Sequence, residues 1–122
     1  MAIRTIGVVG AGQMGAGIAQ VAAATGRDVI LQDIAPEFVE HGMATIRGSL
    51  NKFVAKGKLP AAEAEAIAAR ITPSVEQAPL AETDMVIEAI VEDQNIKQEL
   101  FATLGQLCPS GTILASNTSS IS

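Results

Sequence analysis

Continuous apolar runs alternate along this chain with segments whose apolar residues recur every three or four positions. The apolar runs predict strands at residues 3–9, 28–32, 84–91 and 112–115, and residues 71–75 predict a further short strand. The recurring pattern predicts helices at residues 13–24, 61–70 and 95–107, and a long helix that begins near Pro36. Residues 78–83 are then a connection. Because Pro73 has no backbone N–H, we expect its strand at or near an edge of the sheet.

The long helix carries a single apolar stripe. Its members follow one another at spacings of three and four residues, and they are Val39, Met43, Ile46, Leu50 and Phe53. The segment 56–60, which contains a glycine and a proline, ends the helix.

Strands that alternate with helices predict an α/β fold with a doubly wound parallel sheet of the Rossmann type and right-handed crossovers. The chain has 122 residues, enough for one domain with its own core. The alternation stops after the fifth predicted strand, with no helix to cover that strand. We therefore expect residues 1–122 to be an incomplete domain, truncated after its fifth strand, at the amino-terminal end of a longer protein.

The first turn from strand to helix contains the pattern Gly-x-Gly-x-x-Gly at positions 10, 12 and 15. Gly10 permits the tight turn, Gly12 lets a pyrophosphate approach the backbone, and Gly15 lets the helix lie close to the sheet. The N–H groups at the start of the helix would face the phosphates. The pattern therefore predicts a dinucleotide site, and an ordinary strand-turn-helix unit is the alternative.

Asp33 ends the second predicted strand, about 20 residues after the glycine motif, where dinucleotide-binding domains carry the acid that binds the ribose. Its carboxylate would accept hydrogen bonds from both adenosine-ribose hydroxyls and would repel a 2′-phosphate. Neither Ile34 nor Ala35 offers a cation to such a phosphate. The sequence thus favours NAD over NADP as the cofactor, with a solvated carboxylate at a strand end as the alternative.

The formal net charge of −5 argues against a nucleic-acid partner, because proteins that bind the phosphate backbone normally present a basic face.

The single cysteine, Cys108, excludes an internal disulfide and is expected to be a small buried side chain near a helix end. No apolar run reaches the ~20 residues of a membrane span, and residues 1–4 leave no room for a signal or transit peptide. These features predict a cytoplasmic location, and we expect no metal site.

Four of the eight basic residues lie close together in the sequence with no acid between them: Arg47, Lys52, Lys56 and Lys58. Ser49, Lys52 and Lys56 follow one another at spacings of three and four, so they share one helix face. Two interpretations stay open at this point. The face is either a solvated lysine surface or a site for an anion, such as the phosphates of a ligand.

Polar residues also follow the fourth and fifth predicted strands, where a parallel sheet opens into its binding cleft. Glu88 and Glu92 come first, Lys97 lies one turn beyond on the next helix, and residues 116–120 supply small donors and acceptors. A polar loop with a partly exposed ion pair is the alternative. His41, the only histidine, lies away from this edge and is expected to be a surface residue rather than a base.

Three blocks of sequence together resemble the L-3-hydroxyacyl-CoA dehydrogenase family, which includes the bacterial 3-hydroxybutyryl-CoA dehydrogenases. They are GAGQMGAGIAQ at 10–20, VIEAIVED at 86–93 and ASNTSS at 115–120. The similarity runs from Ile3 to the last residue, and the second and third blocks are more specific than the glycine motif. The resemblance implies an NAD-dependent interconversion of (S)-3-hydroxyacyl-CoA and 3-ketoacyl-CoA in fatty acid metabolism and β-oxidation, with 3-hydroxybutyryl-CoA and acetoacetyl-CoA as expected substrates.

The resemblance also implies roles for individual residues. Ser119 would lie between the nicotinamide and the substrate, with Asn117 in support. The coenzyme A moiety would contact Ser49 and Lys56, which agrees with the basic face that also contains Lys52. The cofactor site would consist of Gly10, Gly12, Gln13, Met14, Gly15, Asp33, Glu92, Lys97 and Ser119.

The family's catalytic histidine and the glutamate that orients it are expected beyond Ser122, as is the helical domain that forms the family's homodimer and closes over the substrate. The 122-residue chain alone is therefore expected to be inactive. Two other classes stay open on the residues themselves. One is a 3-hydroxyacid dehydrogenase with a catalytic lysine, against which residues 117–120 argue, and the other is a non-catalytic NAD-binding or structural protein with the same fold.

Overall fold

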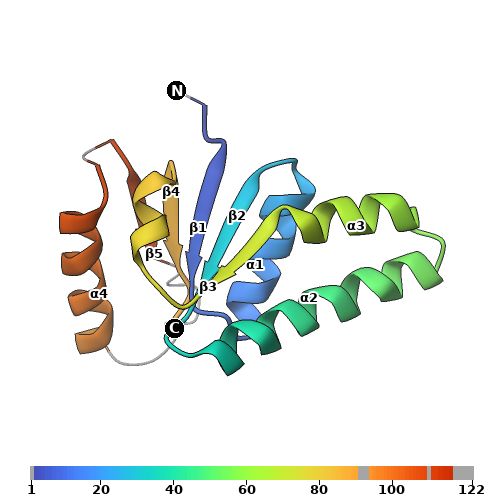
Figure 1. Ribbon diagram of the computed structural model, residues 1–122, viewed down its shortest axis with the longest axis horizontal. Coiled ribbons are helices and arrows are strands. Elements are labelled where there is room, and N and C mark those ends of the chain that lie inside the picture. Colours follow the sequence, from blue (N-terminus) through green and yellow to red (C-terminus); the bar gives the residue numbers. More distant parts are fainter. Residues whose placement is uncertain (1, 91–93, 110, 117–122) are drawn as a thin grey trace.

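A computed structural model describes residues 2–90, 94–109 and 111–116. Helices and strands alternate along the chain (Figure 1). Their order is β1 (Thr5–Val9), α1 (Gln13–Ala24), β2 (Asp28–Gln32), α2 (Pro36–Ala55), α3 (Ala61–Ala69), β3 (Ile71–Ser74), the 3-10 helix η1 (Ala78–Glu82), β4 (Met85–Glu88), α4 (Gln94–Leu107) and β5 (Ile113–Ser116).

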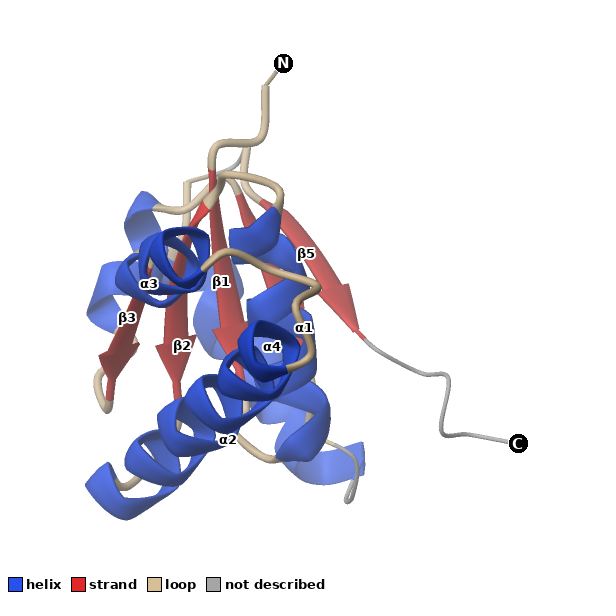
Figure 2. Cartoon of the chain, turned by 90° about the vertical axis from the view of Figure 1, so that its right-hand side faces the viewer, coloured by secondary structure: helices blue, strands red, loops and turns tan. Residues whose placement is uncertain are grey.

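The strands form one parallel sheet in the order β3-β2-β1-β4-β5. Their carboxyl ends point the same way in Figure 2. The sheet grows outward from β1 in both directions, which makes it doubly wound and confirms the predicted α/β fold class. β3 lies at an edge, as Pro73 predicted.

Each face of the sheet has its own cluster of buried side chains. Helices α1, α2 and α3 cover one face, and α4 covers the other together with η1 (Figure 1). Successive residues of β1 illustrate the alternation, because Val8 belongs to the first cluster and Val9 to the second. Both faces of β1 are therefore buried, which explains its continuous apolar run.

Most predicted boundaries lie within one or two residues of the observed ones, and two segments differ more. The fourth strand was expected at residues 84–91, but β4 ends at Glu88, which pairs with Val9, the last residue of β1. Beyond this pair β1 offers no further strand to extend the ladder. The expected connection at residues 78–83 contains η1, whose Leu80 is fully buried.

The apolar stripe of α2 ends differently from the prediction. Val39, Met43, Ile46 and Leu50 are buried, but Phe53 is 43% exposed. Val54, four residues after Leu50, packs against the core instead. The stripe continues at a spacing of four and not three, so Phe53 lies outside it.

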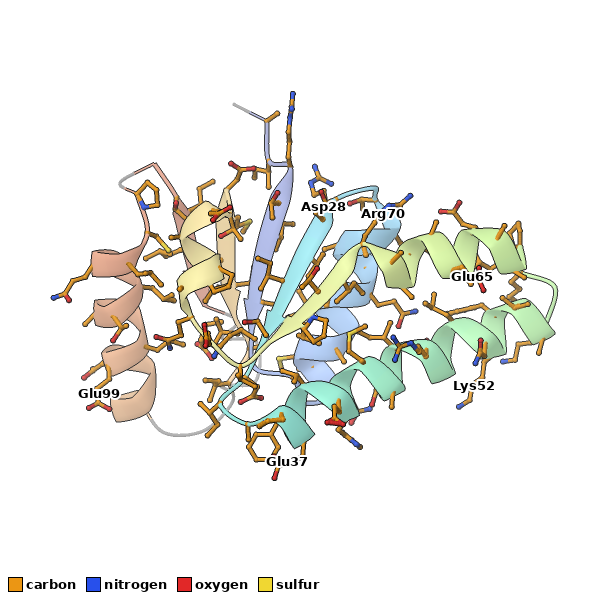
Figure 3. All side chains as sticks on the ribbon, viewed as in Figure 1. Asp28, Glu37, Lys52, Glu65, Arg70 and Glu99 are labelled. Carbon is orange, nitrogen blue, oxygen red and sulfur yellow. The ribbon has the colours of Figure 1, made fainter. Side chains whose placement is uncertain are left out.

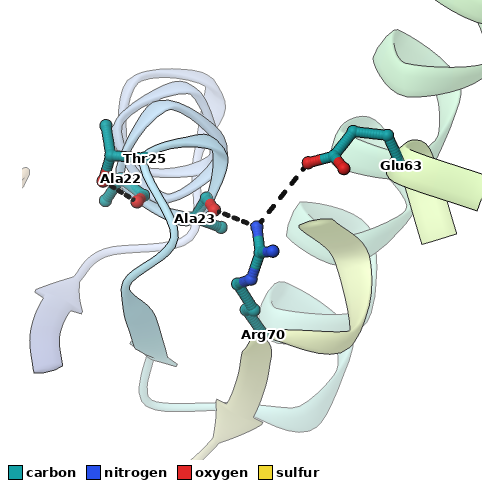
Figure 4. A network of polar contacts seen from close by, with 5 residues as sticks. All are labelled: Ala22, Ala23, Thr25, Glu63 and Arg70. Atoms are coloured by element: carbon teal, nitrogen blue, oxygen red, sulfur yellow. Dashed lines mark hydrogen bonds and ion pairs between the residues drawn. The ribbon is translucent and has the colours of Figure 1, made fainter. Parts of the chain in front are cut away.

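Arg70 ties α3 to the carboxyl end of α1. Its Nη1 atom donates a hydrogen bond to the carbonyl oxygen of Ala23 over 2.7 Å and lies 4.0 Å from a carboxylate oxygen of Glu63 (Figure 4). A cation at this position is favourable because the last carbonyl groups of a helix carry partial negative charge. This contact helps to hold the α2–α3 hairpin against the helix that follows the glycine motif.

Cys108 is buried, as predicted, just after α4. Its Sγ atom lies 3.6 Å from the carbonyl oxygen of Leu80, and burial raises the pKa of the thiol. The thiol is therefore a packing group between α4 and η1.

Candidate functional site

The glycine turn between β1 and α1 has the geometry that its sequence predicted. Gly10 adopts a φ of +107°, a conformation that favours glycine, and its N–H donates to the Gln32 carbonyl oxygen over 2.7 Å. A Cβ atom on Gly12 would meet nothing within 4 Å. Gly12 is also the N-cap of α1, and no side-chain hydrogen bond caps the helix there. The start of α1 therefore faces open space that an anion can enter.

Gly15 is required by a contact that the sequence did not identify. A Cβ atom at this position would lie 1.6 Å from the carbonyl oxygen of Gly10. Gly15 therefore allows the first turn of α1 to pack against the glycine turn itself, and not only against the sheet. Gln13 and Met14 form the same first turn and line an open groove with Ile6 of β1.

Asp33 lies directly beside the glycine turn. Its Oδ2 atom accepts a hydrogen bond from the Ala11 N–H over 2.8 Å, and its Oδ1 atom accepts one from the Ile34 N–H over 2.7 Å. The side chain is only half-buried, and each carboxylate oxygen can accept a second hydrogen bond. The carboxylate is thus held in a fixed orientation with capacity for two ribose hydroxyls.

The side chain of Gln32 holds the backbone around Asp33 in place. Its side chain is 2% exposed, and its Nε2 atom donates to the carbonyl oxygens of Asp33 and Val75 over 3.1 and 3.2 Å. The Asp33 N–H donates to the Ser74 carbonyl oxygen over 3.1 Å. The ends of β2 and β3 are therefore joined at the position from which Asp33 projects. The only signal in the sequence was a polar residue at the end of an apolar strand.

Gly42 brings α2 against the same turn. A Cβ atom at this position would lie 2.8 Å from the carbonyl oxygen of Ala11. Helix α2, which carries the basic residues, thus contacts the glycine turn without an intervening side chain. The sequence did not indicate a role for Gly42, because the residue that it contacts, Ala11, is 31 positions away in the chain.

Glu88 was expected in a polar loop or an open cleft, and this expectation was wrong. It is the last residue of β4, lies between Val9 of β1 and Ser116 of β5, and is fully buried. Its carboxylate accepts a hydrogen bond from the Ile90 N–H. Because Ile90 is the second residue after the strand, Glu88 fixes the start of the β4–α4 connection, which also packs against Gly10.

The four clustered basic residues do not form a single patch. Arg47 lines a cleft of about 290 Å³ between α2 and α3, together with Glu65. Lys52 extends from α2 away from α3, whereas Glu65 lies on the side of α3 that faces α2 (Figure 3). Lys56 and Lys58 are exposed at the end of α2. The positive surface thus comprises lysines, and Arg47 belongs to the interhelical cleft.

Ser49 is placed by a contact with the first helix. Its Oγ atom accepts a hydrogen bond from the Nε2 atom of Gln20, on α1, over 3.1 Å. This bond connects the helix that follows the glycine turn to the helix with the lysines. Lys52 follows Ser49 on the same face and is exposed.

The structure describes only part of the predicted cofactor and substrate site. Glu92, Asn117 and Ser119 lie outside the described residues, and Lys97 is placed only as a backbone position on α4. His41 is exposed on α2, in agreement with its expected surface position. Within the described ranges no helix is long and apolar enough to cross a membrane.

The described residues fit a dinucleotide. The open space beside Gly12 and the start of α1 suits a pyrophosphate, and the oriented carboxylate of Asp33 suits a ribose. Both lie at the carboxyl ends of β1 and β2, beside the place where the strand order reverses. Doubly wound folds bind their ligands at such a point.

Comparisons with known proteins agree with this geometry. The family described as "3-hydroxyacyl-CoA dehydrogenase, NAD binding domain" matches residues 5–122. The chain belongs to this family. NAD is accordingly the cofactor of the domain, as the sequence predicted.

Individual members of the 3-hydroxyacyl-CoA dehydrogenase family are closely similar to the chain. A probable 3-hydroxybutyryl-CoA dehydrogenase from Deinococcus radiodurans is 51% identical over 115 residues, which cover 94% of this chain and 41% of the relative. A 3-hydroxyadipyl-CoA dehydrogenase from Escherichia coli is 44% identical over 98% of this chain and 25% of its own length. The chain thus spans less than half the length of these curated relatives.

A solved structure shows the same fold. The crystal structure of (S)-3-hydroxybutyryl-CoA dehydrogenase from Ralstonia eutropha superimposes with a TM-score of 0.94 at 42% identity, over 99% of this chain and 43% of that one. The Rossmann-type fold and the predicted resemblance to 3-hydroxyacyl-CoA dehydrogenases are therefore both confirmed.

Proposed function

We propose that this chain is the NAD-binding portion of an enzyme that interconverts (S)-3-hydroxyacyl-CoA and 3-ketoacyl-CoA thioesters, with 3-hydroxybutyryl-CoA and acetoacetyl-CoA as its substrates. The observation that carries the proposal is the Asp33 carboxylate, held 2.8 Å from the Ala11 N–H beside an open glycine turn. The names of the relatives support the substrate class. The direct test is NADH oxidation that depends on acetoacetyl-CoA, measured with the full-length protein.

In this proposal the residues of the chain bind and orient, and NAD supplies the hydride acceptor. The glycine turn holds the pyrophosphate and Asp33 holds the adenosine ribose. Glu92 and Lys97 line the rest of the cofactor site, while Ser119, with Asn117 in support, positions the substrate against the nicotinamide. Ser49, Lys52 and Lys56 bind the phosphates of coenzyme A.

We also propose that the full-length protein is a cytoplasmic homodimer, with acyl-CoA and NAD as its ligands and no nucleic-acid partner. The net charge of −5 over residues 1–122 supports the last point. Size-exclusion chromatography with light scattering tests the dimer directly.

Replacement of Asp33 by alanine is expected to weaken NAD binding by ~1–3 kcal/mol, because charge-assisted hydrogen bonds to the ribose are lost. Asp33→Asn keeps an oxygen that can accept from Ala11 but removes the charge that repels a 2′-phosphate. This variant should therefore bind NADP better than the unmodified protein does. Isothermal titration calorimetry with both cofactors gives the two affinities.

Asp28 provides the matched control, because it is an exposed aspartate at the start of β2, whereas Asp33 follows the end of that strand (Figure 3). Asp28→Asn makes the same change of charge and should leave both affinities as they are. An NAD affinity that is the same in Asp33→Ala and in the unmodified protein would contradict the ribose assignment.

Replacement of Lys56 by alanine in the full-length protein is expected to raise the KM for acetoacetyl-CoA about tenfold, because an ion pair with a phosphate is lost. The affinity for NAD should stay the same. Lys58→Ala removes the same charge two residues away and should have a much smaller effect. Equal effects of Lys56→Ala on both ligands would mean that the face is not a substrate site.

A further inference from the structure

An exposed phenylalanine lies at the end of α2. Phe53 is 43% exposed, whereas Ile46 and Leu50 of the same helix are 0% and 3% exposed. The stripe that packs on the core continues through Val54, so the core does not require an aromatic ring at position 53. Exposed apolar side chains are common on protein surfaces, so the significance of Phe53 depends on the residues that share its face of the helix.

Phe53 shares a helix face with Ser49 and Lys56. The three residues stand at positions i, i+4 and i+7, and residues at these spacings lie above one another on a helix. Lys56 is the C-cap of α2, and its N–H donates to the Lys52 carbonyl oxygen over 3.1 Å, so the helical spacing persists to this point. The ring is thus bracketed by a hydroxyl on one side and by an ammonium group on the other.

The hydroxyl in this row has a fixed position. The Nε2 atom of Gln20 donates to Ser49 Oγ over 3.1 Å, which leaves the hydroxyl hydrogen for an acceptor such as a phosphate oxygen. Lys52 flanks the same row and is exposed. A planar apolar group therefore lies among three groups that donate hydrogen bonds to anions.

We propose that the ring of Phe53 stacks against the adenine base of coenzyme A, while Ser49, Lys52 and Lys56 bind the phosphates next to that base. This inference rests on the proposed function and adds a base-binding residue to the same surface. The chemistry matches, because the nucleotide end of coenzyme A carries a flat base close to several phosphates, whereas its pantetheine arm is uncharged. Stacking on an aromatic side chain needs no specific hydrogen bonds to the base.

The experiment compares two substrates in the full-length protein at saturating NADH. One is acetoacetyl-CoA, and the other is the acetoacetyl thioester of pantetheine, which lacks the adenosine and its phosphates. Phe53→Leu is expected to raise the KM for acetoacetyl-CoA about tenfold and to leave the KM for the pantetheine thioester unchanged. Phe53→Tyr keeps an aromatic ring and should retain the KM for acetoacetyl-CoA.

Phe38→Leu is the matched control, because Phe38 is 48% exposed near the other end of the same helix. It should not alter the ratio of the two KM values. If Phe53→Leu raises both KM values equally, the ring packs against the protein chain and the inference is overturned. An unchanged KM for acetoacetyl-CoA overturns the inference alone, and an unmodified protein that turns over neither thioester overturns the proposed function together with it.

Discussion

A chain that ends at Ser122 is expected to bind NAD but to oxidise NADH with acetoacetyl-CoA at least ~10²–10⁴-fold more slowly than the full-length protein. Reduction of the ketone requires an acid that protonates the developing alkoxide oxygen to give the hydroxyl, and the reverse reaction requires the corresponding base. Within the described residues, His41 is exposed on α2, Glu88 is buried and bonded to the Ile90 N–H, and the Cys108 thiol is buried with a raised pKa. None of these groups is placed to exchange a proton with a substrate beside the glycine turn.

The comparison needs proof that the short chain is folded. Calorimetry with NAD gives this proof, because binding requires the glycine turn and Asp33 to be in place. A folded, NAD-binding chain of 122 residues that turned over acetoacetyl-CoA as fast as the full-length protein would contradict the dependence on a catalytic histidine that the family resemblance implies. It would also require a proton donor among the residues present.

The arrangement of the sheet could be predicted from local sequence because its causes are local. Pro73 lacks an N–H, which predicted the edge position of β3, and the apolar run of residues 3–9 marked β1, which is buried on both faces. The glycine motif and Asp33 were found in the same way, since each is recognised by its distance from a strand end. Their positions beside one another then follow from the pairing of β1 with β2.

The remaining parts of the site depend on contacts between distant segments. Gly42 is needed because α2 crosses Ala11, and Gln32 is needed because its amide reaches Val75. The burial of Glu88 arises only when β1 and β5 lie on either side of it. Neither the periodicity nor the composition of the sequence contains this information.

At the end of the apolar stripe of α2, the sequence pattern is compatible with two ways of packing the helix. Phe53 and Val54 are both apolar, and they follow Leu50 at spacings of three and four, each compatible with a helix. The sequence pattern therefore could not decide which of them packs on the core. The position of α2 against the sheet selects Val54 and leaves Phe53 exposed.

The largest effect on stability is expected from Gly15→Ala. The added Cβ would lie 1.6 Å from the carbonyl oxygen of Gly10. The backbone fixes the position of a Cβ atom and its neighbour is a backbone carbonyl group, so no side-chain rotation can relieve the clash. Either α1 or the glycine turn must move by more than an ordinary packing adjustment. We therefore expect the free energy of unfolding to fall by about 3 kcal/mol or more, with loss of NAD binding.

Gly17→Ala is the matched control, because it adds the same atom two residues later in the same helix. A Cβ atom there would meet nothing within 4 Å, and the position is exposed. Since alanine is the better helix former, this variant should be more stable by ~0.5–1 kcal/mol. Urea unfolding followed by circular dichroism measures both changes, and the two variants should shift the midpoint in opposite directions. A Gly15→Ala chain that unfolded at the midpoint of the unmodified chain would mean that α1 does not pack against the Gly10 carbonyl group as described.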